Sequence, residues 1–135
     1  MRTKHVLMVD DDRDLVASVK AYLEARGYVV DTANNGLEAW ERLRERLPDL
    51  ILLDIMMDYD TEGFKVAEEL HKNPTTKSIP VVIMSGFTKE LDTKTDVFEP
   101  MMYNEWTAAK FIEKPAKLAD IAAAIDMQLG GGDAL

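Results

Sequence analysis

The feature that most constrains the fold is a regular alternation of two kinds of segment along the chain. Short apolar runs that favour β-strands are separated by longer segments whose apolar residues recur at the period of an α-helix. Strands that are apolar along their whole length are typical of a parallel sheet covered on both faces. The predicted strands are HVLMV (His5–Val9), YVVDT (Tyr28–Thr32), LILL (Leu50–Leu53), PVVIM (Pro80–Met84) and KFIE (Lys110–Glu113).

Four helices are predicted between and after these strands. Their expected buried faces are Leu15, Val19, Tyr22 and Leu23; Leu37, Trp40, Leu43 and Leu47; Phe64, Ala67, Leu70 and His71; and Leu118, Ile121, Ala122, Ile125 and Leu129. Asn35 with Glu38 predicts a capping box, Gly27 predicts a helix end, and Pro115 predicts the first turn of the last helix. This order of elements indicates an open α/β sheet.

Composition narrows the class of protein. A chain of 135 residues suits one domain, which we expect over residues 1–129, followed by a tail or linker over residues 130–135. The absence of cysteine excludes disulfides and thiolate metal sites, and fits a reducing, cytoplasmic setting. A net charge of −9 argues against nucleic-acid binding by this domain. No apolar run reaches the roughly 20 residues of a membrane span, and the N-terminus does not resemble a signal peptide.

Charged and hydroxyl residues follow the ends of the predicted strands. Asp10 and Asp11 follow the first strand, Asp54 follows the third, Ser85 follows the fourth and Lys114 follows the fifth. Ligands of an open α/β sheet bind beyond the carboxyl ends of its strands, so these residues are expected to share one pocket. Two carboxylates about 5 Å apart repel by roughly 3 kcal/mol at an effective dielectric constant near 20. A divalent cation with oxygen ligands, such as Mg²⁺, relieves this repulsion.

A metal-supported carboxylate, a lysine and a hydroxyl are the groups that phosphoryl transfer to an aspartate requires. In this respect the sequence resembles the receiver domain of response regulators in two-component signal transduction. The motifs that carry the resemblance are VLMVDDD, LILLDIMM, VVIMSG and FIEKP, and they extend it over about residues 4–129.

The resemblance implies a role for each of these residues. Asp54 is the expected phosphoacceptor, held beside Mg²⁺ or Mn²⁺, and Ser85 and Lys114 are expected to contact the phosphoryl group. The expected metal ligands are Asp11 directly, Asp10 mainly through water, Asp54, and the backbone carbonyl of Met56. Phe111 occupies the family's aromatic switch position, Asp12 is expected to cap the first helix, and Met56 and Phe87 flank the path of the hydrolytic water.

The sequence departs from the family pattern in the loop after Asp54 and in a later segment. Asp58 stands where the family usually has proline, and Gly63 comes one position later than the usual glycine. The stretch from Ser85 to Lys114 is several residues longer than usual, and Thr88–Trp106 has no continuous helical face. Because this region normally carries the output and dimerisation surface, the sequence leaves the oligomeric state open.

Two other motifs overlap the segment DYDTEGFKVAEE. It places Asp58, Asp60, Glu62, Gly63 and Glu69 at the offsets of an EF-hand calcium loop, but Lys65 stands where that loop needs an apolar residue. DYDTEG also resembles the nucleophile motif of haloacid-dehalogenase-type phosphatases, although the acidic run at Asp10 precedes it instead of following it.

We therefore expect a flavodoxin-like, doubly wound sheet of five parallel strands in the order 2-1-3-4-5. The expected function is to take a phosphoryl group from a histidine kinase or phosphotransfer protein onto Asp54 and to switch conformation. This implies Mg²⁺-dependent self-phosphorylation and autodephosphorylation without turnover of a separate substrate. The alternative is a pseudo-receiver, a protein-interaction module that is never phosphorylated.

Overall fold

The computed structural model describes residues 3–54, 62–85, 108–114 and 116–130; for residues 62–64, 85 and 108–111 the description covers the backbone alone. Five strands form one sheet: β1 (His5–Val9), β2 (Val29–Ala33), β3 (Leu50–Asp54), β4 (Val81–Ser85) and β5 (Ala108–Glu113). All neighbouring strands are parallel, in the order β2-β1-β3-β4-β5. This is the flavodoxin-like topology predicted from the sequence.

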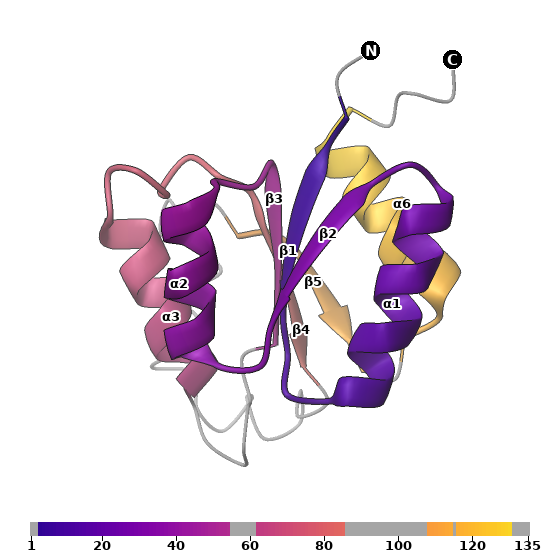
Figure 1. Cartoon of the computed structure of the whole chain (residues 1–135), viewed down its shortest axis with the longest axis horizontal. Helices are drawn as coiled ribbons and strands as arrows, with labels where there is room; N and C mark the ends of the chain where they lie inside the picture. Colours follow the sequence, from indigo (N-terminus) through magenta and orange to yellow (C-terminus); the bar gives the residue numbers. More distant parts are fainter. Residues whose placement is uncertain (1–2, 55–61, 86–107, 115, 131–135) are drawn as a thin grey trace.

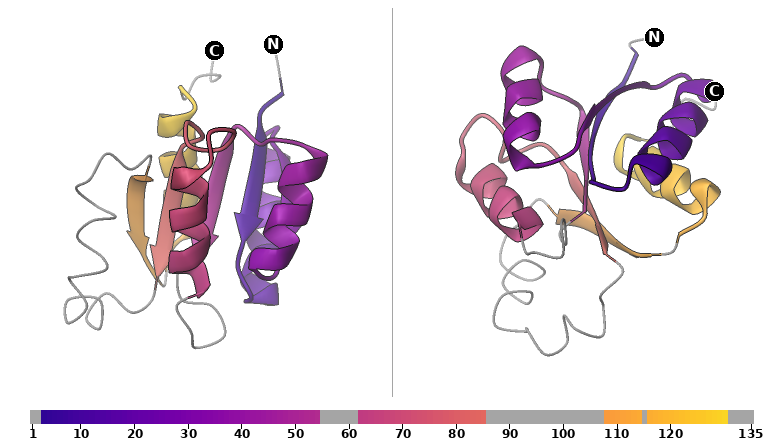
Figure 2. Two further views of the ribbon diagram at one scale, coloured as in Figure 1. Left: turned by 90° about the vertical axis from the view of Figure 1, so that its left-hand side faces the viewer. Right: turned by 60° about the horizontal axis from the view of Figure 1, so that its bottom comes forward.

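Four described helices cover the sheet on both faces. They are α1 (Arg13–Ala25), α2 (Gly36–Glu45), α3 (Glu62–Lys72) and α6 (Leu118–Gln128). Figures 1 and 2 show α2 and α3 on one face of the sheet and α1 and α6 on the other. Among these described helices, none combines the length and the apolar character that crossing a membrane requires.

The fully apolar strands are explained by two separate cores. Leu7 and Val9 of β1 belong to the cluster under α2 and α3, whereas Val6 and Met8 of the same strand belong to the cluster under α1 and α6. All five residues of β3 are buried. Successive side chains of a strand point to opposite faces, so a strand covered on both faces has no position left for a solvated side chain.

The predicted strand positions agree with the structure to within two residues. The first strand is the same as predicted, and the third extends by one residue to include Asp54. The second begins at Val29, because the Tyr28 backbone N–H still donates to the Leu23 carbonyl in the turn that closes α1. The fifth begins two residues early, at Ala108, where the register between β4 and β5 is irregular.

The expected buried face of α2 is wrong in part. Leu37 and Leu47 are 70% and 46% exposed, while Ala39 is buried and Trp40 packs only partly against the core. The buried side of α2 passes through Gly36, Ala39 and Leu43, so it is offset around the helix from the predicted stripe and shares Leu43 with it.

Most of the predicted helix signals are confirmed. The Asp12 carboxylate accepts from the Leu15 N–H at the start of α1. The Asn35 side chain accepts from the Glu38 N–H, and Glu38 in return accepts from the backbone N–H of Asn34, one residue before the expected partner.

Gly27 has a positive φ of 97° after the end of α1, the left-handed conformation that favours glycine. The prediction for the last helix is wrong, because α6 begins at Leu118 with Lys117 at its N-cap, beyond Pro115. The Thr88–Trp106 segment and the tail over residues 131–135 lie outside the described residues.

Candidate phosphoacceptor site

The carboxyl edge of the sheet gathers three carboxylates. Asp10 directly follows β1, and its backbone N–H continues the ladder by donating to the Ala33 carbonyl at 3.0 Å. Asp54 is the last residue of β3, which pairs with β1. One oxygen each from Asp10, Asp11 and Asp54 lies within 4.8 Å of the others. In the described part of the chain, this is the single group of three such side chains positioned to hold a metal ion.

Two of these carboxylates are removed from solvent. The exposed fractions of Asp10 and Asp54 are 0% and 3%, and Asp11 is partly exposed at the rim. Buried carboxylates are costly unless they are paired and hydrogen-bonded. A basic residue from the far end of the chain meets part of this requirement.

Lys114 contacts two of the acids at once. It comes directly after β5, and its Nζ lies 2.8 Å from Oδ2 of Asp10 and 3.3 Å from Oδ2 of Asp54. Burial of the ammonium lowers the pKa of Lys114, but hydrogen bonds and charge attraction from Asp10 and Asp54 outweigh it. The pKa of Lys114 therefore lies above its ordinary value of 10.5, and the residue is a cation at neutral pH.

Both oxygens of Asp10 have protein partners. Oδ1 accepts from the backbone N–H of Asp12 at 2.9 Å, while Oδ2 accepts from Lys114. The Asp12 side chain is separately engaged as the cap of α1. Asp10 and Asp12 thus have different tasks. The turn that enters α1 holds the Asp10 carboxylate in a fixed orientation.

Two more predicted site residues are placed by their backbones. Ser85 ends β4 and pairs in register with Glu113, one residue before Lys114. This puts Ser85 at the same carboxyl edge as the acids. Phe111 lies within β5, in register with Ile83 of β4. Met56, Asp58 and Phe87 lie outside the described residues.

The EF-hand reading is overturned by the start of α3. That helix runs from Glu62 to Lys72, so Gly63 and every later position of the supposed calcium loop, up to Glu69, are helical. An EF-hand loop needs its glycine at a sharp turn and its last glutamate at the start of the following helix. The segment cannot form that loop.

The donor set fits a small divalent cation. Three carboxylates and one ammonium leave two formal negative charges, all on oxygen, at one edge of the sheet. Oxygen ligands with excess negative charge suit Mg²⁺. No histidine belongs to the group, and the chain contains no cysteine, so softer metals have no preferred ligand here.

Sequence comparison finds relatives that are regulatory proteins. The response regulator PleD of Caulobacter vibrioides is 38% identical over 110 residues, which are 82% of this chain and 22% of PleD. The phosphate regulon transcriptional regulatory protein PhoB of Rhizobium meliloti is 35% identical over 85 residues, 63% of this chain and 37% of PhoB. The chain therefore spans between about a fifth and two fifths of the length of these relatives.

Solved structures share the fold over nearly the whole chain. The receiver domain of a signal transduction histidine kinase from Syntrophus aciditrophicus superposes with a TM-score of 0.79 at 27% identity, covering 97% of this chain and 93% of that one. A CheY-like receiver domain protein from Methanospirillum hungatei gives 0.73 at 26% identity, covering 97% and 100%.

A family model, the response regulator receiver domain, matches residues 6–126. That span runs from β1 into α6 and includes Asp10, Asp54 and Lys114. The chain therefore belongs to the response regulator receiver domain family.

Proposed function

We propose that this receiver domain accepts a phosphoryl group on Asp54 from the phosphohistidine of a histidine kinase or phosphotransfer protein. The observation that carries the proposal is the contact of Lys114 with both Asp10 and Asp54 inside a group of three carboxylates. Carboxylates that served only as helix caps would not need a shared lysine. A receiver built only for protein contacts would have no reason to bear this electrostatic cost.

The chemistry follows from the positions of the groups. An oxygen of the Asp54 carboxylate forms a bond to phosphorus while the phosphorus–nitrogen bond of the phosphohistidine breaks and the imidazole leaves with its electron pair. Asp54 ends a buried strand, which restricts the directions from which its oxygen can attack. Lys114 lies close enough to pair with the oxygens of the transferred group. Bound Mg²⁺ supplies additional positive charge at those oxygens.

The proposed role of Asp10 follows from how its carboxylate is already used, and the other metal ligands are those that the family resemblance implies. Both oxygens of Asp10 accept hydrogen bonds from the protein, so Asp10 is proposed to hold the ion through water. Asp11, at the rim, and Asp54 are the proposed direct carboxylate ligands, with the carbonyl of Met56 completing the protein's share. Ser85 is proposed to hydrogen-bond the phosphoryl group, and Phe111 to report its presence as the switch residue.

The proposal also covers the domain boundaries and the cellular location. Residues 1–129 are proposed to form the receiver unit and residues 130–135 a tail or linker, in a cytoplasmic protein. The acidic balance of the chain favours protein partners over nucleic acid.

Incubation with acetyl phosphate and Mg²⁺, followed by intact-mass measurement, tests the function. We expect one phosphoryl adduct on the wild type and none on Asp54→Asn. Asp12→Asn is a matched control, because it makes the same chemical change at a neighbouring acid that caps α1. An unmodified wild type that also fails to bind Mg²⁺ would identify the chain as a pseudo-receiver.

A further inference from the structure

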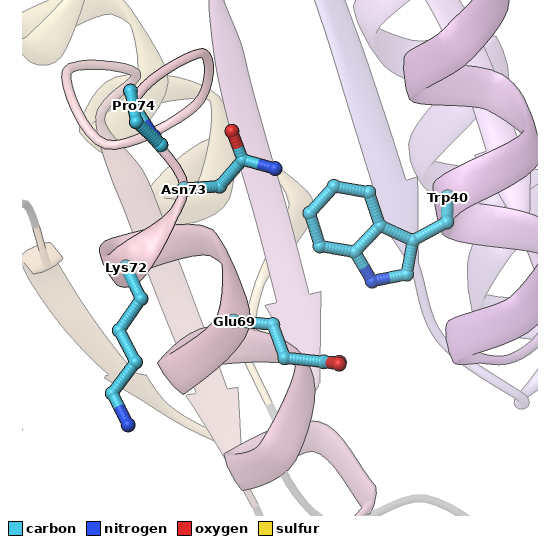
Figure 3. A pocket seen from close by; sticks show the side chains of 5 residues that line it. All are labelled: Trp40, Glu69, Lys72, Asn73 and Pro74. Atoms are coloured by element: carbon cyan, nitrogen blue, oxygen red, sulfur yellow. The ribbon is translucent and has the colours of Figure 1, made fainter.

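A second candidate site lies away from the acidic cluster, in an open groove between α2 and α3 (Figure 3). Its volume is about 520 Å³, and it is lined by Trp40, Glu69, Lys72, Asn73 and Pro74. α3 starts beyond the carboxyl end of β3 and leads back to the start of β4, so Asn73 and Pro74 lie toward the opposite edge from Asp54. Phosphoryl transfer uses none of these residues.

The walls of the groove are held in place. On one side, Trp40 packs partly against the buried cluster under α2 and α3. On the other side, Oδ1 of Asn73 accepts from the Thr75 N–H at 2.9 Å. The buried Thr76 hydroxyl donates to the Leu70 carbonyl at 2.7 Å, which fastens the turn after α3. The groove is therefore largely formed before any ligand binds.

The charges that line the groove are not equivalent. The ammonium of Lys72 lies 2.9 Å from the Glu68 carboxylate, and Figure 3 shows the Lys72 side chain directed away from Trp40. The Glu69 side chain extends from α3 toward the side on which the indole lies. Among the described residues, no hydrogen bond or ion pair is formed by the Glu69 carboxylate. The groove therefore presents an aromatic ring and an available negative charge.

We propose that this groove binds an arginine side chain of a partner protein. An aromatic face attracts a cation, and a carboxylate adds a charge-assisted hydrogen bond. Guanidinium satisfies both because it is planar, stacks on aromatic rings and pairs with carboxylate through two N–H groups. The net charge of −9 further favours a basic partner.

The same surface supplies an apolar flank for the residues around that arginine. Leu37 precedes Trp40 by three positions on α2 and is 70% exposed. Residues three apart on a helix are neighbours on its surface, so Leu37 and Trp40 form a continuous apolar strip beside the groove. The proposed ligand is thus a peptide segment in which an apolar residue adjoins the arginine.

The test is a titration of ¹⁵N-labelled protein with the capped peptide acetyl-Leu-Arg-Leu-amide, observed at the indole N–H of Trp40. The matched ligand contains citrulline, which has nearly the shape of arginine but no charge. We expect the arginine peptide to shift the Trp40 signal and to bind about threefold to tenfold more tightly than the citrulline peptide. Trp40→Phe identifies the signal.

Two variants separate the groove from general electrostatics. Glu69→Gln should weaken the preference for arginine over citrulline, because only the attraction between Trp40 and the cation then distinguishes the two peptides. Glu24→Gln makes the same charge change at an exposed position on α1, on the other face of the sheet, and should preserve it. Equal binding of the two peptides by the wild type, a preference that Glu69→Gln leaves unchanged, or a Trp40 signal that does not respond would each overturn the proposal. Asp54→Asn should bind like the wild type, so this result is independent of phosphorylation.

Discussion

The Nζ atom of Lys114 lies 2.8 Å from Oδ2 of Asp10, a residue 104 positions earlier in the chain, and the Asp10 side chain has no exposed surface. We expect Lys114→Met to lower the free energy of unfolding by about 2 kcal/mol without metal, because it leaves a buried carboxylate without its cation. Urea denaturation in a chelating buffer measures this loss. Lys77→Met, at an exposed lysine, should change stability little.

A double-mutant cycle tests whether the loss arises from Asp10 itself. Asp10→Asn should cost less in the Lys114→Met background than in the wild type, because the unpaired charge is then removed. Additive effects of the two substitutions would show that the two residues are not coupled.

The stability difference between the wild type and Lys114→Met should depend on pH in a defined direction. The pKa of Lys114 is raised in the folded protein, against about 10.4 in an unfolded chain. Its contribution to stability is therefore complete below that value and is lost as the pH rises through the folded pKa. The stability difference between wild type and Lys114→Met should stay constant from about pH 7 to pH 9 and shrink above about pH 10.5. A decrease already between pH 7 and 9 would contradict the raised pKa.

Mg²⁺ should stabilise the folded domain, because three carboxylates converge in the native state alone. At a free concentration ten times the dissociation constant, the expected gain is about 1.4 kcal/mol. Thermal melts with and without Mg²⁺ measure it. Asp11→Ala should abolish the gain, while Asp14→Ala, an exposed acid in the first turn of α1, should keep it. Equal gains in both variants would place the ion elsewhere.

The phosphorylated form is predicted to be long-lived. Hydrolysis needs a water held in line with the Asp54 oxygen and phosphorus, and Met56 and Phe87 offer no strong hydrogen-bonding group to hold it. Both side chains are also large enough to obstruct its approach. We expect Met56→Asn with Phe87→Glu to lose the phosphoryl group faster than the wild type, as followed by intact mass over time. An unchanged rate would mean that these positions only cover the rim of the site.

The exposed edge of β2 is predicted to be protected by two basic side chains. Nζ of Lys20 donates to the Val30 carbonyl at 3.4 Å, and Nε of Arg42 donates to the Thr32 carbonyl at 3.1 Å. Lys20→Ala with Arg42→Ala should cost about 1–2 kcal/mol and promote self-association, because an unpaired strand edge recruits other strands. Sedimentation velocity at increasing protein concentration tests this. Arg44→Ala, an exposed charge on α2, should remain like the wild type.

The acidic site could be predicted from the sequence because it depends on strand ends. Asp10, Asp54 and Lys114 each follow or end an apolar run, and the carboxyl ends of parallel strands necessarily meet at one edge. Apolar runs of this kind are a local property of the chain. The order of the strands then follows from the few connections that βαβ units permit.

The buried side of α2 could not be predicted in the same way. A helical period locates an apolar strip, but it does not say which side of that strip faces the sheet. Ala39 is buried and Leu37 exposed because α2 turns the side that carries Ala39 and Leu43 toward the sheet. The groove beside Trp40 depends on the same packing, because its other wall is formed by α3 and the turn that follows it.

The fold class, and the identity of the acids and the lysine at the carboxyl edge, can be predicted from the sequence alone, because apolar runs and the residues that end them are local properties of the chain. The way in which Lys114 is shared between two acids is set by the packing of the folded chain. Oδ1 of Asp10 is engaged by the Asp12 N–H and Oδ2 by Lys114, while Lys114 also reaches Asp54. The two contacts of Lys114 depend on ångström-scale distances between side chains from three separate strand ends, and no local pattern encodes such distances.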